Sequence, residues 1–287
     1  MNLARKHFQQ HQAKSAAETA AEFGTMRNTN AYEQQLLQLN SDKNRLKNIQ
    51  SKQNKIELKR QLIPNYKPYV EGILEVKPGV QDAVITEILV WSIDIGDFDF
   101  ALDIAEYILK YGLKLPDRFE RSEACFVTED IAEEFLKLLK TEAGIDQKGL
   151  DQLVRLERLI TDKSLPQNRL DMPDEVKAKL YLALGKGEMQ FLTGDLENDL
   201  PRAVHAQNWL EKALDLDDKC GGRTDLNKMS KLATKLLAER ETTDALAYQN
   251  ESQVVTTNEQ TEVTDILLNQ NGTPVVDDHG NMVPTSE

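Results

Sequence analysis

Apolar residues recur every three or four positions along much of this 287-residue chain, which is the spacing produced by one face of an α-helix. The clearest run covers residues 85–109 and is interrupted once, at Gly96 and Asp97. Glycine tolerates the left-handed backbone just past a helix end, and Asp97 or Asp99 could accept hydrogen bonds from the free N–H groups that open the next helix. The pattern therefore predicts two amphipathic helices and a tight turn, with the second helix ending near Gly112.

Residues 31–63 show a narrower apolar pattern, with spacing close to seven residues, and predict one long helix. A helix with so narrow an apolar stripe should pack on another helix, from this chain or from a second subunit. The stripe consists of Tyr32, Leu39, Leu46, Ile49, Ile56 and Ile63, and is interrupted by Asp42, Gln53 and Arg60.

Further helices are expected in the middle of the chain, and two of them should form a second hairpin. Gly194 and Asp195 repeat the glycine-aspartate turn signal seen at Gly96 and Asp97. This echo suggests a tetratricopeptide-like hairpin, although simple packing of two helices explains it nearly as well. The expected helices are residues 129–140 with Thr128 as N-cap, 150–160, 174–190 and 201–216, with residues 162–173 as a connection.

The composition agrees with an all-α chain of several small helical units. Glycine and proline are sparse, at 14 and 9 residues, and no run shows convincing strand alternation. Two distant cysteines cannot form a disulfide framework, and no stretch approaches the roughly 20 apolar residues that span a bilayer. We expect a cytoplasmic protein without membrane contact. The expected domains are residues 1–65 (basic and helical), 66–162 (central helical), 163–240 (second hairpin unit) and 241–287 (tail).

Charge is unevenly distributed, although the whole chain has a net charge of −13. Residues 1–60 hold eleven basic and five acidic side chains, whereas residues 61–287 hold 24 basic and 43 acidic ones. Any contact with DNA is therefore expected near the N-terminus, where basic groups would displace phosphate counterions. The alternative is a solvated, lysine-rich helix face. The candidate DNA-binding residues are Lys43, Arg45, Lys47, Lys52, Lys55, Lys59 and Arg60.

The C-terminal segment has a different character. Residues 241–287 contain nine acidic and no basic side chains and are rich in Thr, Asn and Gln, which predicts a disordered acidic tail. A small apolar island at residues 263–268 could fold onto a partner as a short helix.

Several segments, in order from about residue 30 to about residue 220, carry a recognisable combination of residues. They include Trp91, Asp94, Gly96, Asp97, Tyr107, residues 109–113, Pro116, residues 31–34, 59–64, 69–74 and 172–180. Together they resemble the small terminase subunit family of tailed phages and prophages of the Peduovirus type. The resemblance implies binding of viral double-stranded DNA at the packaging start site by a homo-oligomeric ring. It also implies cooperation with a large, ATP-hydrolysing subunit in the cytoplasm of a bacterial host. A basic tail occurs in family members, and this sequence departs from that pattern.

The family is customarily labelled the endonuclease subunit of terminase, and cutting DNA usually requires carboxylates that hold Mg²⁺. The weak catalytic candidates are Asp94, Asp97, Asp99 and Asp103. Helix capping and solvation explain them without metal, so we expect no cofactor in this subunit and Mg²⁺ only if it is an endonuclease. The sequence has no phosphate-binding G-x-x-x-x-G-K-[ST] loop, no zinc-ligand spacing and no nucleophilic triad. The main hypothesis is a DNA-recognition adaptor; a metal-dependent endonuclease and a helical protein-binding scaffold without DNA binding remain the alternatives.

Overall fold

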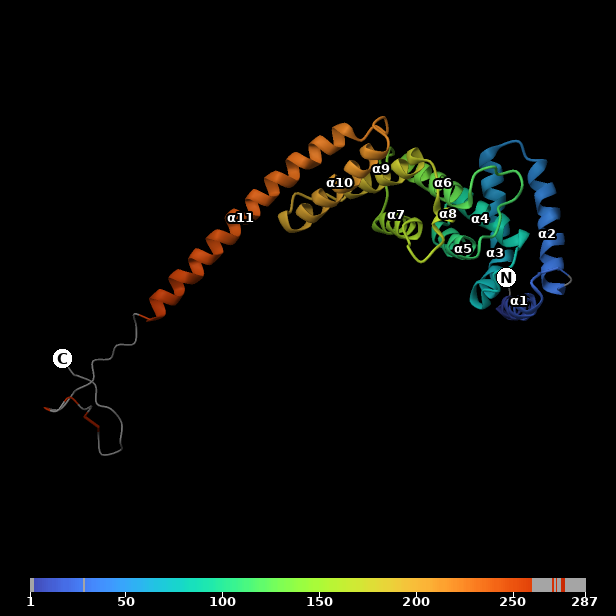
Figure 1. Cartoon of the computed structure of the whole chain (residues 1–287), viewed down its shortest axis with the longest axis horizontal. Helices are drawn as coiled ribbons and strands as arrows, with labels where there is room; N and C mark the ends of the chain where they lie inside the picture. Colours follow the sequence, from blue (N-terminus) through green and yellow to red (C-terminus); the bar gives the residue numbers. More distant parts are fainter. Residues whose placement is uncertain (1–2, 28, 260–269, 271, 273–274, 277–287) are drawn as a thin grey trace. The chain divides into compact units, whose positions relative to one another are not determined.

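The computed structural model describes residues 3–27, 29–259, 270, 272 and 275–276. Within these residues the chain forms helices and connecting loops and no β-strand, so the all-α prediction is confirmed. The described helices, labelled in Figure 1, are α1 (Leu3–Phe23), α2 (Asn30–Lys47), α3 (Lys52–Val76), α4 (Ala83–Ile95), α5 (Phe98–Tyr111), α6 (Glu123–Leu138), α7 (Gln147–Ile160), α8 (Gln167–Leu170), α9 (Asp174–Gln190), α10 (Leu196–Leu216) and α11 (Arg223–Glu259). None of them combines the length and apolar character needed to cross a membrane.

The chain divides into two units, residues 1–233 and residues 234–287. In the first unit, one hydrophobic core extends from α1 to α9, and a smaller cluster lies between α9, α10 and the start of α11. Helix α3 runs through residue 65, so the expected end of the N-terminal region falls inside a helix. The four-domain division stays a prediction. Helix α11 enters the predicted acidic tail, and the apolar island at residues 263–268 lies outside the described residues.

The single helix predicted for residues 31–63 is wrong, because a turn at residues 48–51 divides it into α2 and α3. Ser51 caps α3 by accepting a hydrogen bond from the Asn54 amide (3.3 Å), a capping signal that the apolar spacing does not reveal. The seven-residue spacing also shifts by three between Leu46 and Ile49, at this turn. The apolar face of α2 is covered within the chain, by α1, α3 and α4.

Helix α3 also continues past its predicted end at residue 63. Pro64 and Pro68 lie inside the helix, where proline normally removes a backbone hydrogen bond. The helix persists because the following face is buried in the core, with Tyr66, Tyr69 and Ile73 at most 1% exposed.

The hairpin predicted around Gly96 is confirmed as α4 and α5. Gly96 and Gly112 end the two helices with φ values of 78° and 73°, in the left-handed region that favours glycine. Asp97 occupies the N-cap position of α5, but its side chain makes no capping bond, which corrects that part of the prediction. The prediction of Thr128 as an N-cap is also wrong, because α6 starts after Ser122 and buries Thr128 in its interior.

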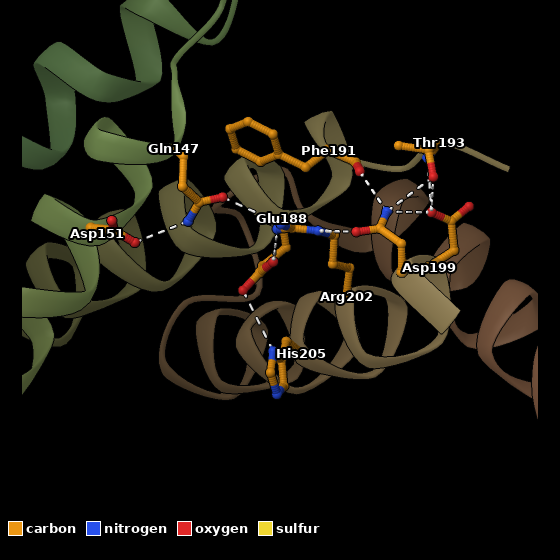
Figure 2. A network of polar contacts seen from close by, with 9 residues as sticks. Gln147, Asp151, Glu188, Phe191, Thr193, Asp199, Arg202 and His205 are labelled. Carbon is orange, nitrogen blue, oxygen red and sulfur yellow. Dashed lines mark hydrogen bonds and ion pairs between the residues drawn. The ribbon is translucent and has the colours of Figure 1, made fainter. Parts of the chain in front are cut away.

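Helices α9 and α10 form the second hairpin, and α9 has its predicted limits. Helix α10 starts five residues earlier than predicted, because Asp195 caps it by accepting a bond from the Asn198 amide (3.0 Å). Asp199 stabilises the turn by accepting hydrogen bonds from the Thr193 and Gly194 amides, both at 2.8 Å. Figure 2 shows this turn beside the pairing of Glu188 with an α10 arginine.

Candidate nucleic-acid interface

Three of the predicted DNA-binding residues surround the turn between α2 and α3. Lys47 is the last residue of α2, Lys52 is the first residue of α3, and Lys55 follows one helical turn later. Lys47 and Lys52 are exposed and Lys55 is half-buried. Within the described part of the chain, none of these three ammonium groups has a hydrogen bond or ion pair. Their charge is therefore available to an anionic partner.

The other four predicted DNA-binding residues have carboxylate partners. Arg45 pairs with Asp42 (2.7 Å) and Arg60 with Glu57 (2.9 Å), each within one helix. The Arg60–Glu57 pair is exposed on both sides and contributes little energy, so Arg60 could exchange its partner for a phosphate. Asp42, in contrast, is buried, so Arg45 neutralises a carboxylate that has little access to water. The remaining two lysines link separate helices: Lys43 of α2 pairs with Glu87 of α4 (3.3 Å), and Lys59 of α3 pairs with Asp94 of α4. The structure thus divides the seven residues into three without partners and four with partners.

Glu87, which the sequence reasoning missed, is a buried acid in the middle of the apolar helix α4. Arg118 donates two hydrogen bonds to its carboxylate, both at 2.7 Å, and the Trp91 indole donates a third at 2.9 Å. Burial opposes ionisation, but the hydrogen bonds and charge of Arg118, with Lys43 nearby, lower the pKa of Glu87 below its usual value. The sequence signal was a charged residue within an otherwise apolar run.

A groove of about 730 Å³ lies between α2, the start of α4 and residues 114–118. Its lining includes four cationic side chains, Lys43, Lys47, Lys114 and Arg118. Two acidic residues also line the groove: Glu87, whose charge is already engaged by Arg118 and Lys43, and the exposed Asp117. Lys47 belongs both to this groove and to the α2–α3 turn, so the two basic regions share a boundary.

The four candidate catalytic aspartates are each bound to a basic side chain. The hydrogen bond from Lys148, with a second from Gln152, lowers the pKa of Asp99. Among the described residues, no three His, Cys, Asp or Glu side chains are grouped so that they could hold a metal ion. These pairs connect α4 and α5 to α3 and α7. The pairs are Asp94 with Lys59, Asp97 with Lys67 (2.7 Å), Asp99 with Lys148 (2.6 Å) and Asp103 with Arg155 (2.7 Å).

Comparison with known proteins agrees with the resemblance found in the sequence. A profile of the family described as phage small terminase subunit matches residues 36–176. The protein named "Terminase, endonuclease subunit" of Escherichia phage P2 is 33% identical over 218 residues, which cover 76% of this chain and 81% of that protein. No solved structure matches the chain. On this similarity, which covers about three quarters of the chain, the chain belongs to the phage small terminase subunit family.

Proposed function

We propose that this protein binds viral double-stranded DNA at the packaging start site and acts with a large ATPase subunit to cut DNA and package it into the capsid. Family membership supports the packaging role. The observation that favours direct DNA contact is the group of three lysines at the α2–α3 turn. They carry no carboxylate partner among the described residues, although acids outnumber bases in the chain by 48 to 35. Unpaired lysines in so acidic a protein are suited to phosphates.

Salt-dependent binding tests the DNA contact. Double-stranded DNA containing the packaging site is titrated with the full chain at several salt concentrations. In a variant with Lys47, Lys52 and Lys55 changed to Ala, the slope of log K against log salt should become shallower by roughly 2.7, because each lost phosphate contact removes about 0.9. The matched control changes three exposed lysines elsewhere in the chain to Ala, namely Lys140, Lys163 and Lys219. Equal binding by the two variants would refute the assignment to the turn.

The ring expected of a small terminase subunit is part of the same proposal. Four large apolar side chains of the N-terminal helices are exposed, namely Leu3, Phe8 and Phe23 of α1 and Leu37 of α2. A neighbouring subunit could cover these side chains. Native mass measurement of the full chain decides the point. We expect a closed ring of several copies, and a strict monomer at micromolar concentration would contradict it.

We further propose that DNA cleavage occurs in the large subunit, although the phage P2 relative is named an endonuclease subunit. The support is that each candidate aspartate binds a lysine or arginine. The chain alone, incubated with packaging-site DNA and Mg²⁺ or Mn²⁺, should leave the DNA intact. Cleavage by the parent protein that is lost in a folded Asp94→Ala/Asp97→Ala variant would establish the endonuclease alternative instead.

A further inference from the structure

We propose that the groove between α2 and residues 114–118 is a second contact for the DNA backbone, continuous with the lysines of the α2–α3 turn. This inference rests on the proposed DNA-binding function and extends it to Lys114 and to the α2 side of the groove. Neither Lys114 nor Arg118 lies in the basic N-terminal sixty residues, so the charge distribution along the sequence does not point to them.

The backbone of Lys114 is held in a defined position. The side-chain amide of Gln81 donates to the Lys114 carbonyl oxygen (2.9 Å) and accepts from the Lys114 N–H (2.8 Å). The Lys114 side chain is 78% exposed and makes an ion pair with Glu123 at 3.2 Å. A fixed backbone with an exposed ammonium group suits a phosphate contact, because the backbone has little conformational freedom left to lose on binding.

Arg118 differs from Lys114, because its charge is already neutralised by the buried Glu87 carboxylate. Its guanidinium is bound by Glu87 at two points and lies over the Phe119 ring at 4.7 Å. This arrangement keeps the buried acid neutralised, so that Glu87 does not repel a polyanion in the groove. The cations nearest to solvent, Lys47 and Lys114, are then left to contact phosphates.

The position of Lys47 gives the DNA backbone a path. It lines the groove and also ends α2, immediately before the turn that carries Lys52 and Lys55. A phosphate strand that contacts the turn can therefore continue into the groove without crossing an acidic surface of α2. The groove would accept phosphodiester backbone of any sequence, because its cations supply charge and no base-reading geometry.

The experiment adds and removes one charge in the groove. Asn40 is exposed on α2 and lines the groove, whereas Gln34 is exposed on α2 and does not line it. In the full chain, Asn40→Lys should tighten binding to labelled double-stranded DNA and steepen the salt slope by about 0.9, while Gln34→Lys should change both much less. Gain of binding cannot result from misfolding.

The complementary loss uses Lys114→Ala, with Lys163→Ala as the control for removal of an exposed lysine outside the groove. We expect weaker binding and a salt slope shallower by about 0.9 for Lys114→Ala alone. If both groove variants match their controls while the α2–α3 turn variant loses binding, the groove proposal is wrong and the proposed function stands. If Lys114→Ala weakens capture of the large subunit and leaves DNA binding unchanged, the groove is a protein-binding site and the proposal is also wrong. Absence of DNA binding by the parent chain would overturn both proposals.

Discussion

Replacement of Glu87 by Ala should be among the most destabilising single changes in α4. The carboxylate is 4% exposed and accepts two hydrogen bonds from Arg118 and one from Trp91. Arg118 and Lys43 are 44% and 37% exposed, so water can replace part of the hydrogen bonding and charge pairing that they lose. Trp91 is 1% exposed, and its indole N–H would remain buried without a partner at a cost of about 1–3 kcal/mol. Together with part of the charge-assisted bonds, the loss should be about 3–4 kcal/mol.

Urea denaturation, with tryptophan fluorescence as the probe of unfolding, measures this loss of stability. Trp91 contacts the altered site, and a Trp209→Phe background removes the second tryptophan of the chain. Glu87→Gln retains an acceptor for Trp91 and should cost less, about 2 kcal/mol. If Glu87→Ala lowers the free energy of unfolding by less than about 0.5 kcal/mol at an unchanged denaturant slope, the carboxylate does not stabilise the fold as argued.

The stability difference between the parent chain and Glu87→Gln should depend on pH with a definite sign. The pKa of Glu87 is lowered in the folded chain, so its ionised form stabilises the fold above the unfolded value of about 4.3, and that contribution is lost as pH falls through the folded pKa. The stability difference between the parent and Glu87→Gln should be nearly constant around neutral pH and shrink below about pH 4. A difference that grew on acidification would contradict the assignment.

Substitutions at three further positions test the packing and the capping of the fold. Gly72→Ala would place Cβ 2.7 Å from a backbone oxygen of α1 and should lower the free energy of unfolding by about 1–3 kcal/mol, measured as a lower Tm. Gly185→Ala meets the Leu210 side chain at 2.7 Å and should lower the Tm less if that flexible side chain can move, so an equal or larger drop would contradict the argument. Asp82→Ala removes the N-cap of α4 and the acceptor of the buried Tyr69 hydroxyl, at about 2–4 kcal/mol in urea denaturation, whereas Asp82→Asn retains an acceptor and should cost less; equal losses would refute this account.

The parts of the fold that could be predicted from the sequence are those determined by residues close together along the chain. The 3.6-residue spacing and the glycines at 96 and 112 fix the limits of α4 and α5, because helix ends are local events. Helix α3 shows where local signals fail. Pro64 indicates a stop, yet burial of residues on the next two turns outweighs the lost hydrogen bond, and this burial depends on helices distant in sequence.

The candidate site divides in the same way. The unpaired lysines at the α2–α3 turn were on the predicted list, since charge density can be counted from the sequence. The sequence could not separate Lys47 from Lys43, because the partner of Lys43 lies 44 positions away on another helix. Arg118 and Glu87 pair across 31 positions, and no spacing rule connects them. Ion pairs with residues distant in sequence thus decide part of which charges remain available.

The small buried face of helix α1 affects local unfolding of the chain. Its buried face consists of four small side chains, Ala13, Ala16, Ala17 and Ala20, whereas α4 buries ten consecutive residues, from position 84 to position 93. Four buried methyl groups contribute about 3 kcal/mol, which is well below the global stability of a typical domain. We therefore predict that the N-terminal helix undocks as a separate foldon, with loss of its Lys6–Glu71 and Lys14–Glu75 ion pairs, while the rest of the core stays folded. Its amide protons should exchange through this local opening, long before those of α4.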